Sequence, residues 1–273
     1  MNTARAAWRR LEPVHGMIYF VPEGKLRYAD LGLSGRAGYF TSRSAAFGRA
    51  PAELVIATFY NFNPEFVRQA VDGAWNATTP QQVLAARYAA AGEALRRARI
   101  HELPDLDEVV ALTRRAAEAA CEHAQGRPLF AAHAALPWPE EPLLRLWHAQ
   151  TLLREFRGDG HVACLLSEGV SGLEALILHA ATGEVPVEFL KASRAWPEEE
   201  WADTQERLRK RGLLDGDALS PEGVLLRRHI EDRTDRLALP AYAALGDAGC
   251  ERLAELAAPV GRAVIEAGLL KLG

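Results

Sequence analysis

The densest group of polar side chains beside an apolar surface lies between Trp147 and His161. In a helix, Trp147, Thr151 and Arg154 share one stripe, because they follow i, i+4 and i+7 spacing. An aromatic face, a hydroxyl and a guanidinium would then point the same way, with His148 beside them. Such a stripe suits an anionic or aromatic small molecule. We therefore predict a ligand-binding surface here.

The next five residues, 157–161 (RGDGH), could carry acid–base chemistry. Their two glycines permit a tight turn that would bring Asp159 near His161. A carboxylate that holds one imidazole nitrogen fixes the tautomer and leaves the other nitrogen as a base or ligand, while Arg157 or Arg154 would stabilise developing negative charge. The alternative is structural: Asp159 caps a helix that begins near His161, and Arg157 pairs with a surface carboxylate.

Residues 58–64 (TFYNFNP) are unusually aromatic and rich in amides. The side chains of Phe59, Tyr60 and Asn61 would form a pocket wall that offers hydrogen bonds beside an apolar surface, joined by Tyr39. The alternative is that the rings belong to the core and the asparagines end a helix before the proline.

His179 is a further ligand-binding candidate, although its apolar helix is more typical of a core histidine.

The sequence motifs of several other chemistries are not found. The sequence contains no HExxH or HxH spacing and no CxxC pair, so we expect neither a metal nor a cofactor. Nucleophile-elbow and phosphate-loop sequences are also missing, which argues against nucleophilic and nucleotide chemistry.

Composition narrows the classes further. The chain has 273 residues, 49% hydrophobic and 25% charged, which is enough to bury one large core or two ordinary ones. The net charge of −4 gives no global attraction to nucleic acid or to an anionic membrane. Three separate cysteines fit a reducing compartment, and no long apolar run follows the polar first residues. We therefore expect a cytoplasmic protein without a membrane segment.

The elements that position these residues are helical, because apolar residues recur at helical rather than alternating spacing. An extended opening is expected at residues 17–21, and a long helix through Trp147 is expected to break at residues 158–160. The rigid Pro-Trp-Pro of residues 137–139 predicts two domains, 1–136 and 137–273.

Residues 187–223 have the element order of a winged helix: a helix, a turn, a second helix, a small hairpin at Asp215-Gly216 and a further helix. The segment RLRKRGLLDGDALSPEG, residues 207–223, resembles the MarR-type winged-helix proteins, in which a similar segment joins the reading helix, the wing and the dimerisation helix. The resemblance covers about the last third of the chain and implies a winged-helix fold there, with terminal helices that pair subunits.

A larger part of the chain resembles a poorly characterised, mainly actinobacterial family that is helix-turn-helix-like. The resemblance lies in ATFYNFNP at residues 57–64 and in LWHAQTLLREFRGDGHVA at residues 146–163. Landmark residues Pro64 and Trp75 have counterparts at Pro186 and Trp196, which suggests a diverged tandem repeat. One chain would then form an intramolecular pseudo-dimer with a ligand pocket between its halves.

The helix expected to enter the DNA major groove is acidic, with Glu198, Glu199 and Glu200 at its start. Carboxylates that face phosphates oppose binding, and the wing is short. We therefore expect a protein that binds an aromatic or anionic small molecule on a MarR-like scaffold, with weak or no DNA binding, as a monomer or a homodimer. The alternatives are an enzyme that uses the His161 and Asp159 pair, and a ligand-responsive transcriptional regulator.

Overall fold

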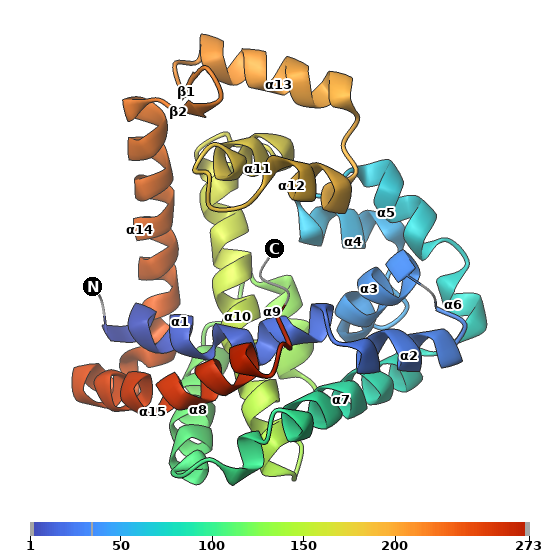
Figure 1. The fold of residues 1–273 in the computed structure, drawn as a ribbon, viewed down its shortest axis with the longest axis vertical. Coiled ribbons are helices and arrows are strands. Elements are labelled where there is room, and N and C mark those ends of the chain that lie inside the picture. Colours follow the sequence, from blue (N-terminus) through green and yellow to red (C-terminus); the bar gives the residue numbers. More distant parts are fainter. Residues whose placement is uncertain (1–2, 34, 271–273) are drawn as a thin grey trace. The chain divides into compact units, whose positions relative to one another are not determined.

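The computed structural model describes residues 3–33 and 35–270. This part of the chain is mainly helical, as the spacing predicted, with one two-stranded antiparallel sheet (Figure 1). The helices are α1 (Thr3–Gly16), α2 (Pro22–Asp30), α3 (Gly35–Ser44), α4 (Ala52–Phe59), α5 (Pro64–Val71), α6 (Ala74–Ala77), α7 (Pro80–Arg97), α8 (Leu106–Cys121), α9 (Pro128–Ala134), α10 (Pro142–Ser167), α11 (Gly172–Ala180), α12 (Val187–Arg194), α13 (Glu198–Lys210), α14 (Pro221–Ala243) and α15 (Gly246–Glu266). The strands are β1 (Leu214–Asp215) and β2 (Ala218–Leu219). No single described helix is long and apolar enough to cross a membrane, although α10 and α11 pass that test as a bent pair.

The described chain forms two compact units, each built from separate stretches of sequence. The first unit comprises residues 3–33, 35–50, 73–159 and 237–270, and the second comprises residues 51–72 and 160–236. This division differs from the two consecutive segments expected, because the chain enters each unit more than once and the proline-rich joint at 137–139 lies inside the first unit.

In the first unit, helices α1 and α15 lie side by side, although they are far apart in the sequence (Figure 1). The guanidinium of Arg10 donates a hydrogen bond to the carbonyl of Ala254 across this contact, at 2.9 Å. Gly261 permits the close approach, since a Cβ there would lie 2.2 Å from the carbonyl oxygen of Arg10. The helix pair therefore depends on the missing side chain at this position.

The extended opening predicted at residues 17–21 is wrong. Helix α1 ends at Gly16, and a 3-10 helix follows at Met17–Tyr19. The apolar side chains that suggested a strand are buried as the continuation of a helical face that begins with Ala7, Leu11 and Val14. Their spacing of three and four residues is the helical signal that outweighs a short apolar run.

The break predicted at residues 158–160 is also wrong, since α10 continues through them to Ser167. An interior glycine costs a helix about 1 kcal/mol relative to alanine. Burial of side chains on both sides of the glycines, such as Phe156 and Cys164, offsets that cost. The tight turn expected around Asp159 therefore does not form.

In the second unit, α11, α12 and α13 enclose a small core that contains Ile177, Leu190, Trp201 and Leu208. Helix α11 begins with a capping box, in which the Ser171 hydroxyl accepts from the backbone of Glu174 and the Glu174 carboxylate accepts from the backbone of Ser171. The helix therefore starts at a fixed residue and holds its apolar face toward α13.

The hairpin after α13 is short, as predicted. Its register pairs Leu214 with Leu219, and the turn residue Gly216 has a φ of +60°. The following helix begins where the sequence indicated, because the Ser220 hydroxyl accepts a hydrogen bond from the backbone N–H of Gly223 at 3.0 Å.

Candidate functional site

The stripe predicted on α10 lies in the core of the first unit. Trp147 and Thr151 are both buried, and the Thr151 hydroxyl donates to the Trp147 carbonyl at 2.8 Å. That hydroxyl therefore accepts from Nδ1 of His15, at 2.9 Å, and Nε2 of His15 accepts from the hydroxyl of Tyr19, at 2.7 Å. The His15 ring is stacked parallel to Trp147 with the ring centres 5.9 Å apart. Helices α1 and α10 thus share one aromatic and polar network.

Two arginines line the same network. The guanidinium of Arg87 lies 5.4 Å from the centre of the Trp147 ring and 5.7 Å from that of Tyr19. Arg43 lies 5.2 Å from the centre of the Tyr19 ring and donates to the hydroxyl of Tyr39 at 2.9 Å. Cation–π contacts of this kind hold a guanidinium in place without neutralising its charge. Tyr39, a predicted pocket residue, therefore belongs to this group.

Two further histidines lie in this part of the first unit. Nδ1 of His148 is hydrogen-bonded to the hydroxyl of Tyr88 at 2.6 Å, and the ring packs edge-on against Trp138. Burial lowers the pKa of His148 to about 4. Burial, together with the positive charge of Arg87, lowers the pKa of His133 to about 3. Both imidazoles are therefore neutral at pH 7 and act as hydrogen-bonding groups rather than as charges.

We call these residues the buried polar cluster; they are His15, Tyr19, Tyr39, Arg43, Arg87, Tyr88, His133, Trp147, His148, Gln150, Thr151, Arg154 and Glu155. Burial raises the pKa of Tyr19 to about 12, so its hydroxyl is neutral. Arg154 forms an ion pair with Glu12, and the carboxylate of Glu155 interacts electrostatically with Arg43. Within the described residues, Arg87 forms no ion pair.

Several polar atoms of the cluster have no hydrogen-bond partner within the described chain. They are Nε of Arg87, Nδ1 of His133, Nε1 of Trp147, Nε2 of His148 and both side-chain amide atoms of Gln150. A buried donor or acceptor without a partner costs about 1–3 kcal/mol. The number of unpartnered atoms in this cluster indicates that it can form further hydrogen bonds, for example with a bound molecule.

The sequence prediction missed His15, Arg87 and Gln150. Arg87 had a visible signal, because it lies four residues after Val83 and three before Ala90, and this helical spacing places it on the apolar face of α7. An arginine on such a face needs a special environment. His15 had no comparable signal, since its partner Thr151 lies 136 residues away in the chain.

The catalytic pair predicted from residues 157–161 does not form. In a continuous helix, Asp159 and His161 project from different sides. The carboxylate of Asp159 instead accepts a hydrogen bond from the backbone N–H of Phe130, at 2.9 Å, at the start of α9. Nδ1 of His161 is hydrogen-bonded to the hydroxyl of Thr234 at 2.9 Å, and Arg157 lies over the Trp8 ring. Asp159 is therefore a helix cap, although for a different helix from the one expected.

The remaining predicted residues belong to the second unit. The hydroxyl of Tyr60 donates to the carbonyl of Val170 at 2.5 Å, and the carbonyl of Asn61 accepts from the Trp196 indole at 2.9 Å. Phe59 is buried. Burial, with the charge of Arg227 next, lowers the pKa of His179. These contacts give the residues structural partners within their own unit.

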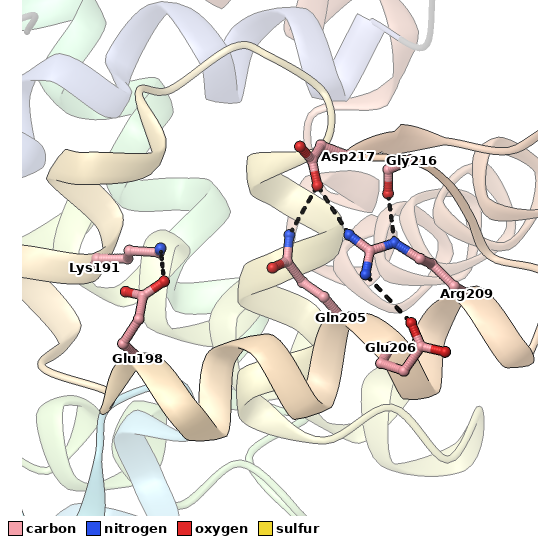
Figure 2. A network of polar contacts seen from close by, with 7 residues as sticks. All are labelled: Lys191, Glu198, Gln205, Glu206, Arg209, Gly216 and Asp217. Carbon is pink, nitrogen blue, oxygen red and sulfur yellow. Dashed lines mark hydrogen bonds and ion pairs between the residues drawn. The ribbon is translucent and has the colours of Figure 1, made fainter.

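A second candidate surface is helix α13 with the hairpin that follows it. Figure 2 shows its charges in pairs: Lys191 contacts Glu198 at 2.6 Å, and Arg209 contacts Asp217 at 3.0 Å and Glu206 at 3.5 Å. Arg209 also donates to the carbonyl of Gly216 in the hairpin turn.

The other cations near the end of α13 also have partners. Lys210 lies 3.7 Å from Glu206, Arg211 lies 2.7 Å from Glu174, and Arg207 donates to the hydroxyl of Thr204. Arg209, Lys210 and Arg211 thus face carboxylates of the protein itself, whereas Arg207 has only a hydroxyl as partner. Its acidic start, residues 198–200, is exposed.

Comparison with known proteins gives one clear result. A helix-turn-helix family matches residues 4–271, so the chain belongs to this family over nearly its whole length. No curated protein and no solved structure matches the chain.

Proposed function

We propose that this protein binds a small aromatic or anionic molecule in the buried polar cluster of its first unit. The observation that carries the proposal is the group of unpartnered polar atoms around Trp147 and Gln150. Native proteins pair nearly all buried polar groups, and the exceptions gather at functional sites. A ligand that supplies the missing partners would account for residues that otherwise destabilise the fold.

We further propose that residues 172–223 form a winged helix of the MarR-like kind whose contact with DNA is weak or lacking. Helix–helix–helix–hairpin order supports the fold. The charges of α13 support weak or absent DNA binding. Exposed Glu198, Glu199 and Glu200 would face the DNA phosphates, and Arg209 is already paired with Asp217. Strong binding of duplex DNA requires about 6–10 contacts from cations to phosphates.

The ligand proposal is tested by native mass spectrometry of the protein purified from its own host. We expect an added mass that disappears in a Gln150→Leu variant, because leucine removes the amide without adding bulk. Gln69→Leu is the matched control, since the amide of Gln69 is exposed and bonded to Glu65. A variant Gln150→Leu that keeps the mass, or a wild-type protein without any, would contradict the proposal.

The DNA proposal is tested by electrophoretic mobility shift with genomic fragments at low salt. We expect retardation that is weak, independent of sequence and lost when salt is raised. Tight, sequence-dependent retardation would contradict the proposal and favour a ligand-responsive regulator.

A further inference from the structure

The Arg87 guanidinium is buried without a carboxylate partner. We propose that it anchors the carboxylate of the ligand, so that the buried polar cluster takes an aromatic monocarboxylate; this inference rests on the function proposed above. Only 1% of Arg87 is exposed, and within the described residues it forms no ion pair. Its one hydrogen bond runs from Nη1 to the hydroxyl of Ser42, at 3.3 Å.

The other arginines of α7 show how unusual this is. Arg97 donates two hydrogen bonds to Glu23, at 2.7 and 3.1 Å, and Arg96 forms an ion pair with Glu141. Both of these arginines lie at the partly exposed end of the helix, where solvent also screens their charge. Arg87 is the member of the three that is removed from water, and it is the one without a carboxylate. Burial of an unpaired charge is strongly unfavourable, which points to an anion as its functional partner.

The edge of the guanidinium that carries Nε has the shape that a carboxylate needs. Nη1 is occupied by Ser42, while Nε has no partner within the described chain. Nε and the second terminal nitrogen together offer two parallel N–H groups, the arrangement that binds both oxygens of a carboxylate. The Trp147 ring lies 5.4 Å from this guanidinium, and its own N–H is also unpartnered.

The charge balance favours a monoanion. Arg87 brings one buried positive charge that has no carboxylate partner within the described chain, and His133 and His148 are held neutral by their lowered pKa values. A singly charged carboxylate would balance the charge of Arg87, whereas a doubly charged phosphate would leave one negative charge unpaired. The rings of Trp147, Tyr19 and His15 supply surfaces for an aromatic body.

The experiment compares matched probes on the full chain. Binding of 1-naphthoate and indole-3-carboxylate, and of the corresponding neutral amides, is measured by calorimetry for the wild type, for Arg87→Met and for Arg114→Met. Arg114 is the control because it lies over an aromatic ring, Trp138, yet has a carboxylate partner, Glu118. We expect the wild type and Arg114→Met to prefer the acids over the amides, and Arg87→Met to bind the acids about 10-fold more weakly or worse.

The melting temperature without ligand is the second readout. If the unpaired charge serves the ligand, Arg87→Met should melt at a higher temperature than the wild type, while Arg114→Met should not. A lower melting temperature for Arg87→Met would show a structural role and overturn the inference. Equal binding of acids and amides would also overturn it, yet leave the proposed function standing. If no probe binds the wild type, the inference fails, and the proposed function then depends on the native mass spectrometry result alone.

Discussion

The two units differ in whether their polar side chains have hydrogen-bond or ion-pair partners. On α13 of the second unit, each cation of the helix contacts a carboxylate or a hydroxyl, at or near the surface. In the first unit, Arg87, His133, His148 and Gln150 are buried with polar atoms that have no partner in the described chain. The charged side chains of α13, the surface that family likeness suggests, thus have polar partners, whereas several buried polar atoms of the first unit have none in the described chain. Unmet hydrogen-bonding capacity is therefore the better indicator of where this protein binds something.

The largest effect is expected from removal of an indole in each core. Trp147→Ala and Trp201→Ala each remove a buried tryptophan and should each lower the free energy of unfolding by about 3–5 kcal/mol, measured by urea denaturation. Only Trp147→Ala should also abolish binding of 1-naphthoate. Loss of binding in Trp201→Ala, or its retention in Trp147→Ala, would remove the distinction between the units.

The next largest effect is expected from the buried carboxylate of Asp159 in the first unit, and it depends on pH. Burial raises the pKa of Asp159 from 3.8 to about 6. The folded state therefore holds this proton more tightly than the unfolded chain, so stability is lost as pH rises through this window, by at most about 3 kcal/mol. Asp159→Asn should be more stable than the wild type at pH 7 and equal to it below pH ~4, by denaturation at each pH.

Glu174 in the second unit differs from Asp159 in having an ion-pair partner, Arg211, at 2.7 Å. Glu174→Gln keeps the helix cap but loses the ion pair, and should lower stability at pH 7 by about 1 kcal/mol or less. An Asp159→Asn variant that is less stable than the wild type at pH 7 would show that its cap to α9 outweighs its burial.

A smaller effect is expected on DNA. Replacement of the three glutamates at 198–200 by glutamine removes the negative charges at the start of α13. Non-specific affinity for duplex DNA at low salt should rise about 10-fold, measured by fluorescence anisotropy. The matched control replaces Glu251, Glu255 and Glu266 on the exposed side of α15. Equal gains from both triple variants would show that only net charge matters.

The smallest effect should be the same in the two units. Thr79 of the first unit and Ser171 of the second each form a capping box. Thr79→Ala and Ser171→Ala should each cost about 1 kcal/mol in urea denaturation. A marked difference between them would mean that helix starts, as well as buried polar groups, distinguish the units.

The sequence predicted what depends on neighbouring residues. Helical spacing placed Trp147 and Thr151 on one stripe, which the structure buries, and the element order of residues 187–223 predicted the helix that begins at Pro221. The prediction failed where the position of a side chain depends on residues far away in the sequence. Asp159 was paired with its neighbour His161, but its partner is Phe130, because α10 continues through two glycines.

Residues far apart in the chain also explain what was missed. His15 joins the cluster through Thr151 and Trp147, and a contact of that separation leaves no periodic signal. The tandem repeat, the pocket between its halves and the state of association stay predictions. Family membership supports the helix-turn-helix assignment. The unpartnered buried atoms could not be predicted from the sequence, because they depend on contacts between side chains in the folded protein.

The pairing of α1 with α15 has a consequence for how the protein is made. Arg10 meets Ala254, which leaves the ribosome 244 residues later. Residues 51–72 and 160–236 have all been synthesised before that moment, so the second unit can fold while α1 still lacks its neighbour. Until residues 246–266 have been made, the face of α1 that packs on α15 has no cover, and it is the surface we expect chaperones to protect.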